Sequence, residues 1–312
     1  MKNTRKRTFE IITHYTGSLI VLISIIFLGF KLLKYRKQLI GFHFGLPHLV
    51  LLVIGPFFFV LGCFILTRAW ERLLIFLGER EVPHNVCVGI YARANIAKYL
   101  PGNIFHFAGR HVLGLKNGFS NVSLGVSLVL EIAGLTLGTS IIGVLGGAVF
   151  GIDRNIFDLR WTLVLMPCLC LLTYLGLKFF SIVFADRFRA LPVFTVKSIV
   201  GGLLPVLWVH ILFLCLIGGI LAVTVAVLSE PISIYEAGMV IAVFAVAWMA
   251  GLLTPGAPAG IGVREAIIIA LLGTMVSESD SIMIAFTFRI ITTLGDLLFW
   301  GVGFLQPYKV KT

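Results

Sequence analysis

Residues 237–276 read AGMVIAVFAVAWMAGLLTPGAPAGIGVREAIIIALLGTMV. This apolar segment is broken at residues 254–262, which include two prolines and three glycines. Proline removes a backbone donor and glycine admits unusual backbone angles, so a helix should end there. The helix expected after the break, over Val263–Val276, would reach about 21 Å, too short for a bilayer core of about 30 Å. We therefore predict a re-entrant hairpin with Pro255 and Gly256 in its turn, because broken backbone at membrane depth must lie inside protein or beside a wet cavity.

A second segment, residues 83–120, has a similar pattern. It is broken at Pro101 and Gly102, and it carries too many basic residues for a helix that faces lipid. Arg110 follows Pro101 by nine positions, just as Arg264 follows Pro255 by nine. We therefore predict a second re-entrant hairpin here.

The chain as a whole has the composition of a membrane protein. Of its 312 residues, 59% are apolar and only 12% are charged, and the mean hydropathy is +1.04. A soluble domain carries about 25% charged residues, so a soluble enzyme, a disordered chain and a nucleic-acid-binding domain are excluded. The five cysteines lie in apolar surroundings without metal-ligand spacing, and we interpret them as core thiols with no disulfide framework and no metal site.

Six apolar stretches are long enough to be predicted as transmembrane helices. The chain is thus expected to form one all-α, polytopic membrane domain over residues 1–312, with no extramembrane domain. The six spans are Ser18–Leu33, Leu46–Thr67, Ser123–Phe150, Trp161–Phe180, Ile199–Leu228 and Ile282–Leu305.

The basic residues predict the orientation of these spans. With six spans, the N-terminus, the turns after the second and fourth spans and the C-terminal tail fall on one side, and all four are basic. The positive-inside rule makes that side cytoplasmic, which predicts a cell-membrane protein with both termini in the cytoplasm. The loop after the first span disagrees, because Lys31, Lys34, Arg36 and Lys37 would lie outside.

The two hairpins also indicate an internal repeat. Arg264 follows Arg110 by 154 positions, close to half the chain, and this offset carries the spans of the first half onto those of the second. Each half, about 10–155 and 156–312, then has three spans, so the second copy is inverted in the membrane. Inverted repeats with broken helices are typical of transporters that bind substrate between the repeats.

These motifs resemble those of a known family. Residues 98–106, KYLPGNIFH, with Gly109-Arg110 after them, and Thr254-Pro255-Gly256 with residues 260–266, GIGVREA, resemble the two signatures of the lysylphosphatidylglycerol synthase transmembrane-region family, also called flippase-like. In its fused members, the multiple peptide resistance factors, this module precedes a soluble aminoacyl-transferase domain and flips the lipid which that domain makes. The resemblance implies the flippase-like module without the synthase domain, and it leaves the lipid open.

Basic residues near the hairpin turns are the candidate substrate-binding residues. A guanidinium stays charged and forks onto phosphate oxygens, so Arg110 and Arg264 suit a lipid phosphate. The alternative is that each ties its hairpin together, with Glu265 as the neighbouring partner of Arg264. The candidate set for the lipid headgroup is Arg110, Arg264, Arg289, Lys98 and His106, although Lys98 could instead snorkel to the interface and His106 could bond locally.

Three carboxylates are candidates for ion pairs or proton transfer. Asp296 lies two helical turns from Arg289 and could neutralise it or Arg264, or carry a coupling proton. Glu131 has no opposite charge within a turn, so we expect either a proton relay or a tie to a hairpin base such as Arg110. Glu265 completes the set.

The functional prediction is a lipid translocator for a phosphate-bearing lipid, which would be a phospholipid, an aminoacyl lipid or a polyprenyl-phosphate-linked substrate. Its partners would be membrane lipids with anionic headgroups, with no cofactor and no nucleic acid. No Walker A loop, G-x-S-x-G elbow or D-x-D-like loop is present, so we do not expect an enzyme. Two alternatives remain: an enzyme subunit acting on a lipid-linked substrate, and a non-transporting partner of a synthase or glycosyltransferase in cell-envelope biosynthesis.

Overall fold

The computed structural model describes Leu33 and residues 45–80, 82–100, 104–149, 199–254 and 256–306. These residues form helices and contain no β-strand, which confirms the predicted all-helical class. The predicted spans Trp161–Phe180 and, apart from Leu33, Ser18–Leu33 lie outside the described residues, as do Pro101, Gly102 and Pro255 of the predicted hairpin turns.

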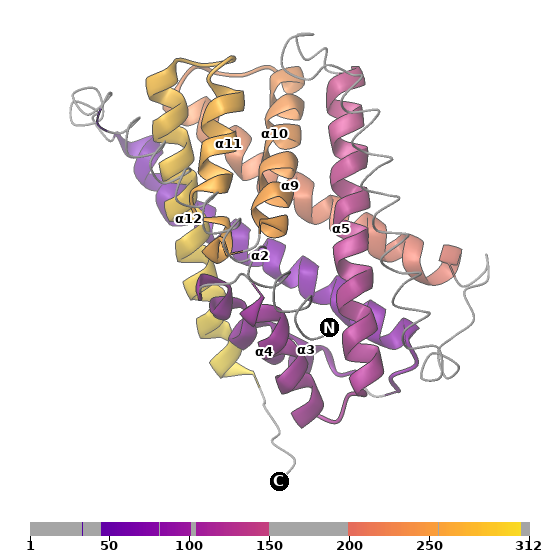
Figure 1. Ribbon diagram of the computed structural model, residues 1–312. Helices are drawn as coiled ribbons and strands as arrows, with labels where there is room; N and C mark the ends of the chain where they lie inside the picture. Colours follow the sequence, from indigo (N-terminus) through magenta and orange to yellow (C-terminus); the bar gives the residue numbers. More distant parts are fainter. Residues whose placement is uncertain are drawn as a thin grey trace, which may run out of the picture.

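Five helices in this part of the chain are long and apolar enough to cross a membrane. The main ones pack side by side, with α2 against α9 and α12, and α10 against α9 and α5 (Figure 1). The protein therefore has the helices of a membrane protein. The five helices are α2 (Leu46–Phe76), α5 (Asn121–Val149), α9 (Leu204–Leu228, after the π-helical turn η2, Ile199–Leu203), α10 (Ile234–Leu253) and α12 (Glu278–Leu305).

Helix α2 is longer than the predicted span, which ended at Thr67. It continues to Phe76, so Arg68 and Arg72 lie within the helix and not in the turn after it. The extension is stable because Trp70, Leu73 and Leu74 are buried.

Helix α10 covers residues that we predicted as one arm of a re-entrant hairpin. Its 20 residues amount to about 30 Å, enough to cross a bilayer core. The helix begins at a capping box, in which the Ser233 side chain accepts a hydrogen bond from the Glu236 backbone N–H and the Glu236 carboxylate accepts one from the Ser233 backbone N–H. It ends at Leu253, just before the Thr254-Pro255 break. Helix α11 (Val263–Leu272) is shorter than the predicted Val263–Val276.

Two helix pairs lie at opposite ends of the molecule. The first helix pair consists of α3 (His84–Asn95), the short 3-10 helix η1 (Ile96–Tyr99) and α4 (Phe105–Lys116), and it lies at the lower end in Figure 1. The second consists of α10, the 3-10 helix η3 (Pro258–Gly260) and α11, and it reaches the upper end. Their inner tips meet, because η1 contacts η3. Helix α12 packs against both pairs.

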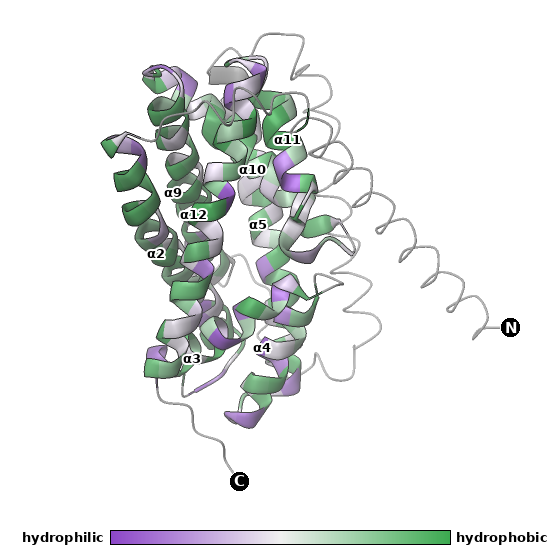
Figure 2. Ribbon diagram, turned by 90° about the vertical axis from the view of Figure 1, so that its left-hand side faces the viewer, coloured by the Kyte–Doolittle hydropathy of each residue, from purple (hydrophilic) through white to green (hydrophobic). Residues whose placement is uncertain are grey.

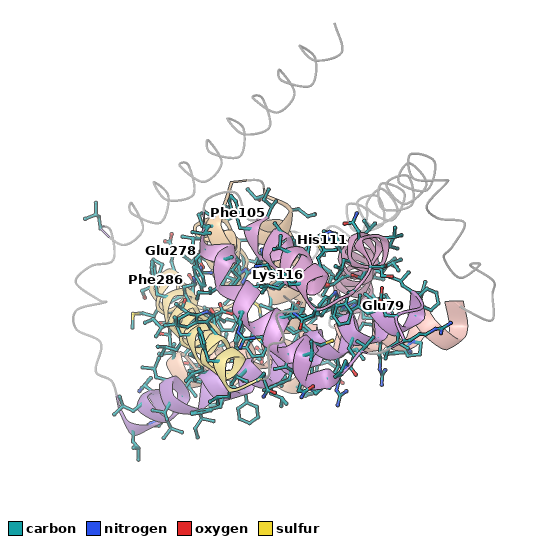
Figure 3. The ribbon with its side chains drawn as sticks, turned by 90° about the horizontal axis from the view of Figure 1, so that it is seen from below. Glu79, Phe105, His111, Lys116, Glu278 and Phe286 are labelled. Carbon is teal, nitrogen blue, oxygen red and sulfur yellow. The ribbon has the colours of Figure 1, made fainter. Side chains whose placement is uncertain are left out.

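Hydrophobic and hydrophilic residues are distributed unevenly over the helices. Figure 2 shows α2 and α9 as predominantly hydrophobic, whereas hydrophilic residues gather on α3 and α4 at the lower end. Figure 3 looks onto that end, where Phe105, His111 and Lys116 project from α4. His111 Nε2 lies 2.7 Å from Asn121 Oδ1 at the start of α5, so this histidine serves a local contact.

The tip of the second helix pair has a tight backbone. Ala259 has a φ of 50° and Gly260 a φ of 69°, and both lie in the left-handed region that favours glycine. A Cβ at Gly260 would lie 3.0 Å from Gly251 Cα, so glycine lets the tip approach α10 closely. Gly256 of the predicted turn also has a positive φ, 87°.

Candidate functional site

Asp296 of α12 fastens the tip of the first helix pair. The carboxylate is 2% exposed, and it accepts hydrogen bonds from Asn95 Nδ2 at 2.7 Å, Lys98 Nζ at 2.7 Å and Tyr99 Oη at 2.8 Å. The Lys98 contact is an ion pair between largely buried groups. Lys98 thus holds the tip to α12 and does not snorkel to the interface.

Arg289, two turns away on the same helix, fastens the tip of the second helix pair. Its Nη1 lies 3.3 Å from Glu265 Oε1 and donates a hydrogen bond of 3.2 Å to the carbonyl of Ala259. The other oxygen of Glu265 accepts a 2.7 Å hydrogen bond from the Gly262 backbone N–H at the start of α11. The left-handed residue Ala259 is therefore held through its carbonyl by α12.

Arg110 and Glu131 form a buried, two-pronged ion pair between α4 and α5. Arg110 Nη1 lies 3.0 Å from Glu131 Oε1 and Nη2 lies 2.5 Å from Oε2. Tyr91 Oη donates a further 2.9 Å hydrogen bond to Oε1. The guanidinium carbon of Arg110 lies 4.6–5.5 Å from the ring centres of Tyr91, Trp70 and Phe107, which adds cation–π stabilisation. In this structure Arg110 is thus a tie between helices.

The remaining predicted arginine is arranged differently. Arg264 of α11 makes no ion pair or hydrogen bond with any residue that the structure describes, and its buried Nε has no partner. Glu265, its sequence neighbour, is engaged by Arg289 instead. A buried cation without a carboxylate is costly in a membrane protein unless it faces a cavity or a ligand.

Such a cavity is present where the two tips meet. It has a volume of about 80 Å³. We call it the central cavity. Apolar side chains from α2, α5, α9 and α10 complete its wall, including Phe59, Cys63, Leu135, Phe213 and Trp248. Its polar lining comes from both helix pairs and from α5, namely Asn95, Lys98, His106, Glu131 and Arg264.

His106 contributes one more unused polar atom. Its Nδ1 is buried and has no hydrogen-bond partner among the described residues. The histidine lies one turn before Arg110 on α4, and it lines the same cavity as Arg264. Since the rest of the charged lining is paired, Arg264 and His106 are the lining groups free to bind a ligand.

The structure brings the predicted residues together around the central cavity, but only some of them form ion pairs. Arg110, Lys98 and Arg289 are bound to Glu131, Asp296 and Glu265, whereas Arg264 has no carboxylate partner among the described residues. Buried nitrogens without a hydrogen-bond partner in this part of the chain remain on Arg264 (Nε), His106 (Nδ1) and Arg289 (Nη2). Sequence reasoning did not find Tyr91, Asn95 and Tyr99, which complete the networks. The only signal for these three residues was their position: they are polar side chains in the segment 83–120, which we predicted as a charged, broken hairpin.

No protein-family model matches the chain, and no curated protein is significantly similar to it. The argument for function consequently rests on the geometry of the central cavity and on the sequence motifs that form it.

Proposed function

We propose that this protein is a lipid translocator that moves a phosphate-bearing lipid between the leaflets of the cell membrane. The observation that carries the proposal is Arg264, a cation without a protein partner among the described residues, on a small cavity between two helix tips. A guanidinium in such a place suits a phosphate oxygen pair. The lipid tails would stay among the apolar helices.

The arrangement of the helices supports an inverted repeat. Shifting α3 and α4 by 154 positions gives 238–249 and 259–270, close to α10 and α11, and shifting α5 gives 275–303, close to α12. The first helix pair reaches the centre from one end of the molecule and the second from the other (Figure 1). Two such pairs whose tips meet at the middle would act as the two gates of an alternating-access transporter.

The small size of the central cavity supports a closed conformation. A volume of about 80 Å³ holds a few water molecules, whereas ligand sites usually measure about 300–1,000 Å³. We therefore interpret the structure as a closed state, with Asp296 and Arg289 holding both tips against α12. Transport would require each tip to separate in turn, with the lipid binding the open states differently.

The basic residues predict the orientation in this proposal, with both termini in the cytoplasm. We place the protein in the cell membrane, where anionic lipids are available. No energy source is part of the proposal.

The test is lipid exchange in liposomes that contain the purified protein. Tail-labelled phosphatidylglycerol is placed in both leaflets, and a reductant that cannot cross the membrane bleaches the outer label. Wild-type protein is expected to expose the inner label, and Arg264→Gln is expected to slow this exchange by about 10–100-fold, the worth of a hydrogen bond to a charged group. Arg68→Gln is the matched control, because the Arg68 side chain is 54% exposed and does not line the cavity.

Two results would count against the proposal. Exchange no faster than in empty liposomes for phosphatidylglycerol and for a labelled polyprenyl phosphate would leave the non-transporting partner as the better reading. Equal exchange rates for Arg264→Gln and Arg68→Gln would remove Arg264 from the binding site.

A further inference from the structure

The charges that the described residues place around the central cavity do not cancel. Four cations and three carboxylates belong to the ion-pair networks and the lining of the cavity. Three cation–carboxylate pairs are complete, so the described residues leave one positive charge, that of Arg264. His106 adds no charge to this count, because it makes no ion pair with a carboxylate among the described residues and lies one turn from Arg110.

The missing negative charge can be located by the internal offset. Arg264 corresponds to Arg110, and position 285 corresponds to Glu131 at the same offset of 154. Position 285 is Ala285, a buried residue of α12, the helix that packs against α11. The first half thus supplies its own counter-ion for its arginine, whereas the second half has a methyl group in the corresponding place.

We propose that the anion which balances Arg264 is a single, singly charged phosphodiester, and that headgroups with a phosphomonoester or a diphosphate are poor substrates. This inference rests on the proposed function and narrows its substrate class. One phosphodiester would bring the net charge of these described groups to zero when the cavity opens to admit it. A dianion would leave an uncompensated negative charge in a site with a largely apolar wall, where an unpaired charge is unfavourable.

The geometry of the paired residues supports the same conclusion. A second phosphate charge would need a second free cation, yet Arg110 is held by both oxygens of Glu131, and Lys98 and Arg289 are held by Asp296 and Glu265. Recruiting Arg110 or Lys98 would leave a buried carboxylate unpaired. Arg289 keeps Nη2 without a hydrogen-bond partner among the described residues, but its charge is already balanced by that of Glu265. The unpartnered His106 Nδ1 can instead share a hydrogen bond with an oxygen of the phosphodiester or with a hydroxyl group of its headgroup.

The test compares two lipids with identical tails, phosphatidylglycerol and phosphatidic acid, in the same liposome assay at pH 8. At that pH a phosphomonoester, whose second pKa is about 6, carries two charges and a phosphodiester carries one. Rates in empty liposomes are subtracted for each lipid. We expect exchange of phosphatidylglycerol to exceed that of phosphatidic acid by at least about tenfold.

A charge variant supplies an independent readout. Ala285→Asp adds a negative charge at the position that corresponds to Glu131, one turn before Arg289 on α12, so it offsets the positive charge left near the cavity and should slow exchange of phosphatidylglycerol. Ala285→Ser, a small polar residue without charge, is the matched control and should keep most of the exchange. Both variants are checked for wild-type elution and thermal unfolding, so that a loss of exchange is not a loss of folding.

The outcomes separate the two proposals. Exchange of phosphatidic acid as fast as that of phosphatidylglycerol overturns the phosphodiester inference and leaves the translocator intact. The phosphodiester inference is also overturned if the Ala285→Asp variant folds and still moves phosphatidylglycerol at the wild-type rate. Absence of exchange for both lipids in the wild type contradicts the proposed function itself.

Discussion

Arg289 and Asp296 lie two turns apart on α12, yet they do not bind each other: Asp296 holds the tip of the first helix pair and Arg289 holds the tip of the second. A single helix thereby fixes both tips around the central cavity. Because breaking a buried pair leaves an uncompensated charge, each contact should resist opening independently.

Replacing Asp296 with Asn should destabilise the protein by about 3 kcal/mol, because Lys98 loses its ion-pair partner in a largely buried place. The midpoint of thermal unfolding in detergent measures this loss. Asp280→Asn on the first turn of the same helix is the control. It should cost only about 0.3–1 kcal/mol, the usual contribution of an acidic residue near a helix N-terminus. Equal midpoints for the two variants would mean that Asp296 does not fasten the tip.

The Arg110–Glu131 pair should show strong coupling. Arg110→Gln and Glu131→Gln should each be destabilising, since each leaves one buried charge unpaired. The double variant should be less destabilised than the sum of the single variants, because no unpaired charge remains. A double-mutant cycle on thermal unfolding measures the coupling, and strict additivity would contradict the tie between α4 and α5.

Arg110→Lys is expected to rescue little of the stability lost in Arg110→Gln. A lysine keeps the charge but cannot reach both oxygens of Glu131 in the same plane, and it stacks less well on Trp70, Tyr91 and Phe107. The measurement is again the unfolding midpoint. Full rescue by lysine would show that charge alone is sufficient at this position.

Neighbouring residues at the second tip should respond in opposite directions to substitution. Ala259→Gly should raise the free energy of unfolding by about 0.5–1 kcal/mol. The left-handed conformation costs an L-residue roughly 1–2 kcal/mol, and the larger entropy that glycine loses on folding offsets part of the relief. Gly260→Ala should destabilise by more than about 1 kcal/mol, since it adds a Cβ at a positive φ and 3.0 Å from Gly251 Cα. Unfolding midpoints that shift in the same direction for both variants would be inconsistent with this tip geometry.

Cys63 reports on the opening of the central cavity. Its side chain is 5% exposed and lines the cavity, so a water-soluble thiol reagent should label it slowly in a variant that keeps only this cysteine. The fully reactive control is a variant whose only cysteine is introduced by Leu115→Cys, at an exposed position of α4. Adding Asp296→Asn should speed the labelling of Cys63, because the first tip is released. Labelling of Cys63 as fast as position 115 in the parent variant would show that the cavity is open.

Much of the fold followed from apolar length and from the places where proline and glycine interrupt it. The predicted spans Leu46–Thr67, Ser123–Phe150, Ile199–Leu228 and Ile282–Leu305 correspond to α2, α5, α9 and α12. The ends were less accurate, because burial of Trp70, Leu73 and Leu74 extends α2 past charged residues that hydropathy treats as a boundary. For the segment that contains α10, length and topology give different answers. Helix α10 is a candidate span by length and composition, yet the tip that follows it meets the tip of the first helix pair at the middle of the molecule, so the re-entrant hairpin stays a prediction.

The sequence by itself determined which charged residues lie within the apolar segments, and therefore which groups form the central cavity. Only the tertiary structure decided how they pair. Seven positions along α12 suggested that Arg289 and Asp296 would meet, and adjacency suggested that Arg264 and Glu265 would. Partners are chosen by the packing of helices distant in the chain, which brings Lys98 to Asp296 across 198 positions and leaves Arg264 on the cavity. The buried carboxylates Asp296, Glu131 and Glu265 pair with cations brought by packing, and among the described residues Arg264 is left on the cavity as the candidate site.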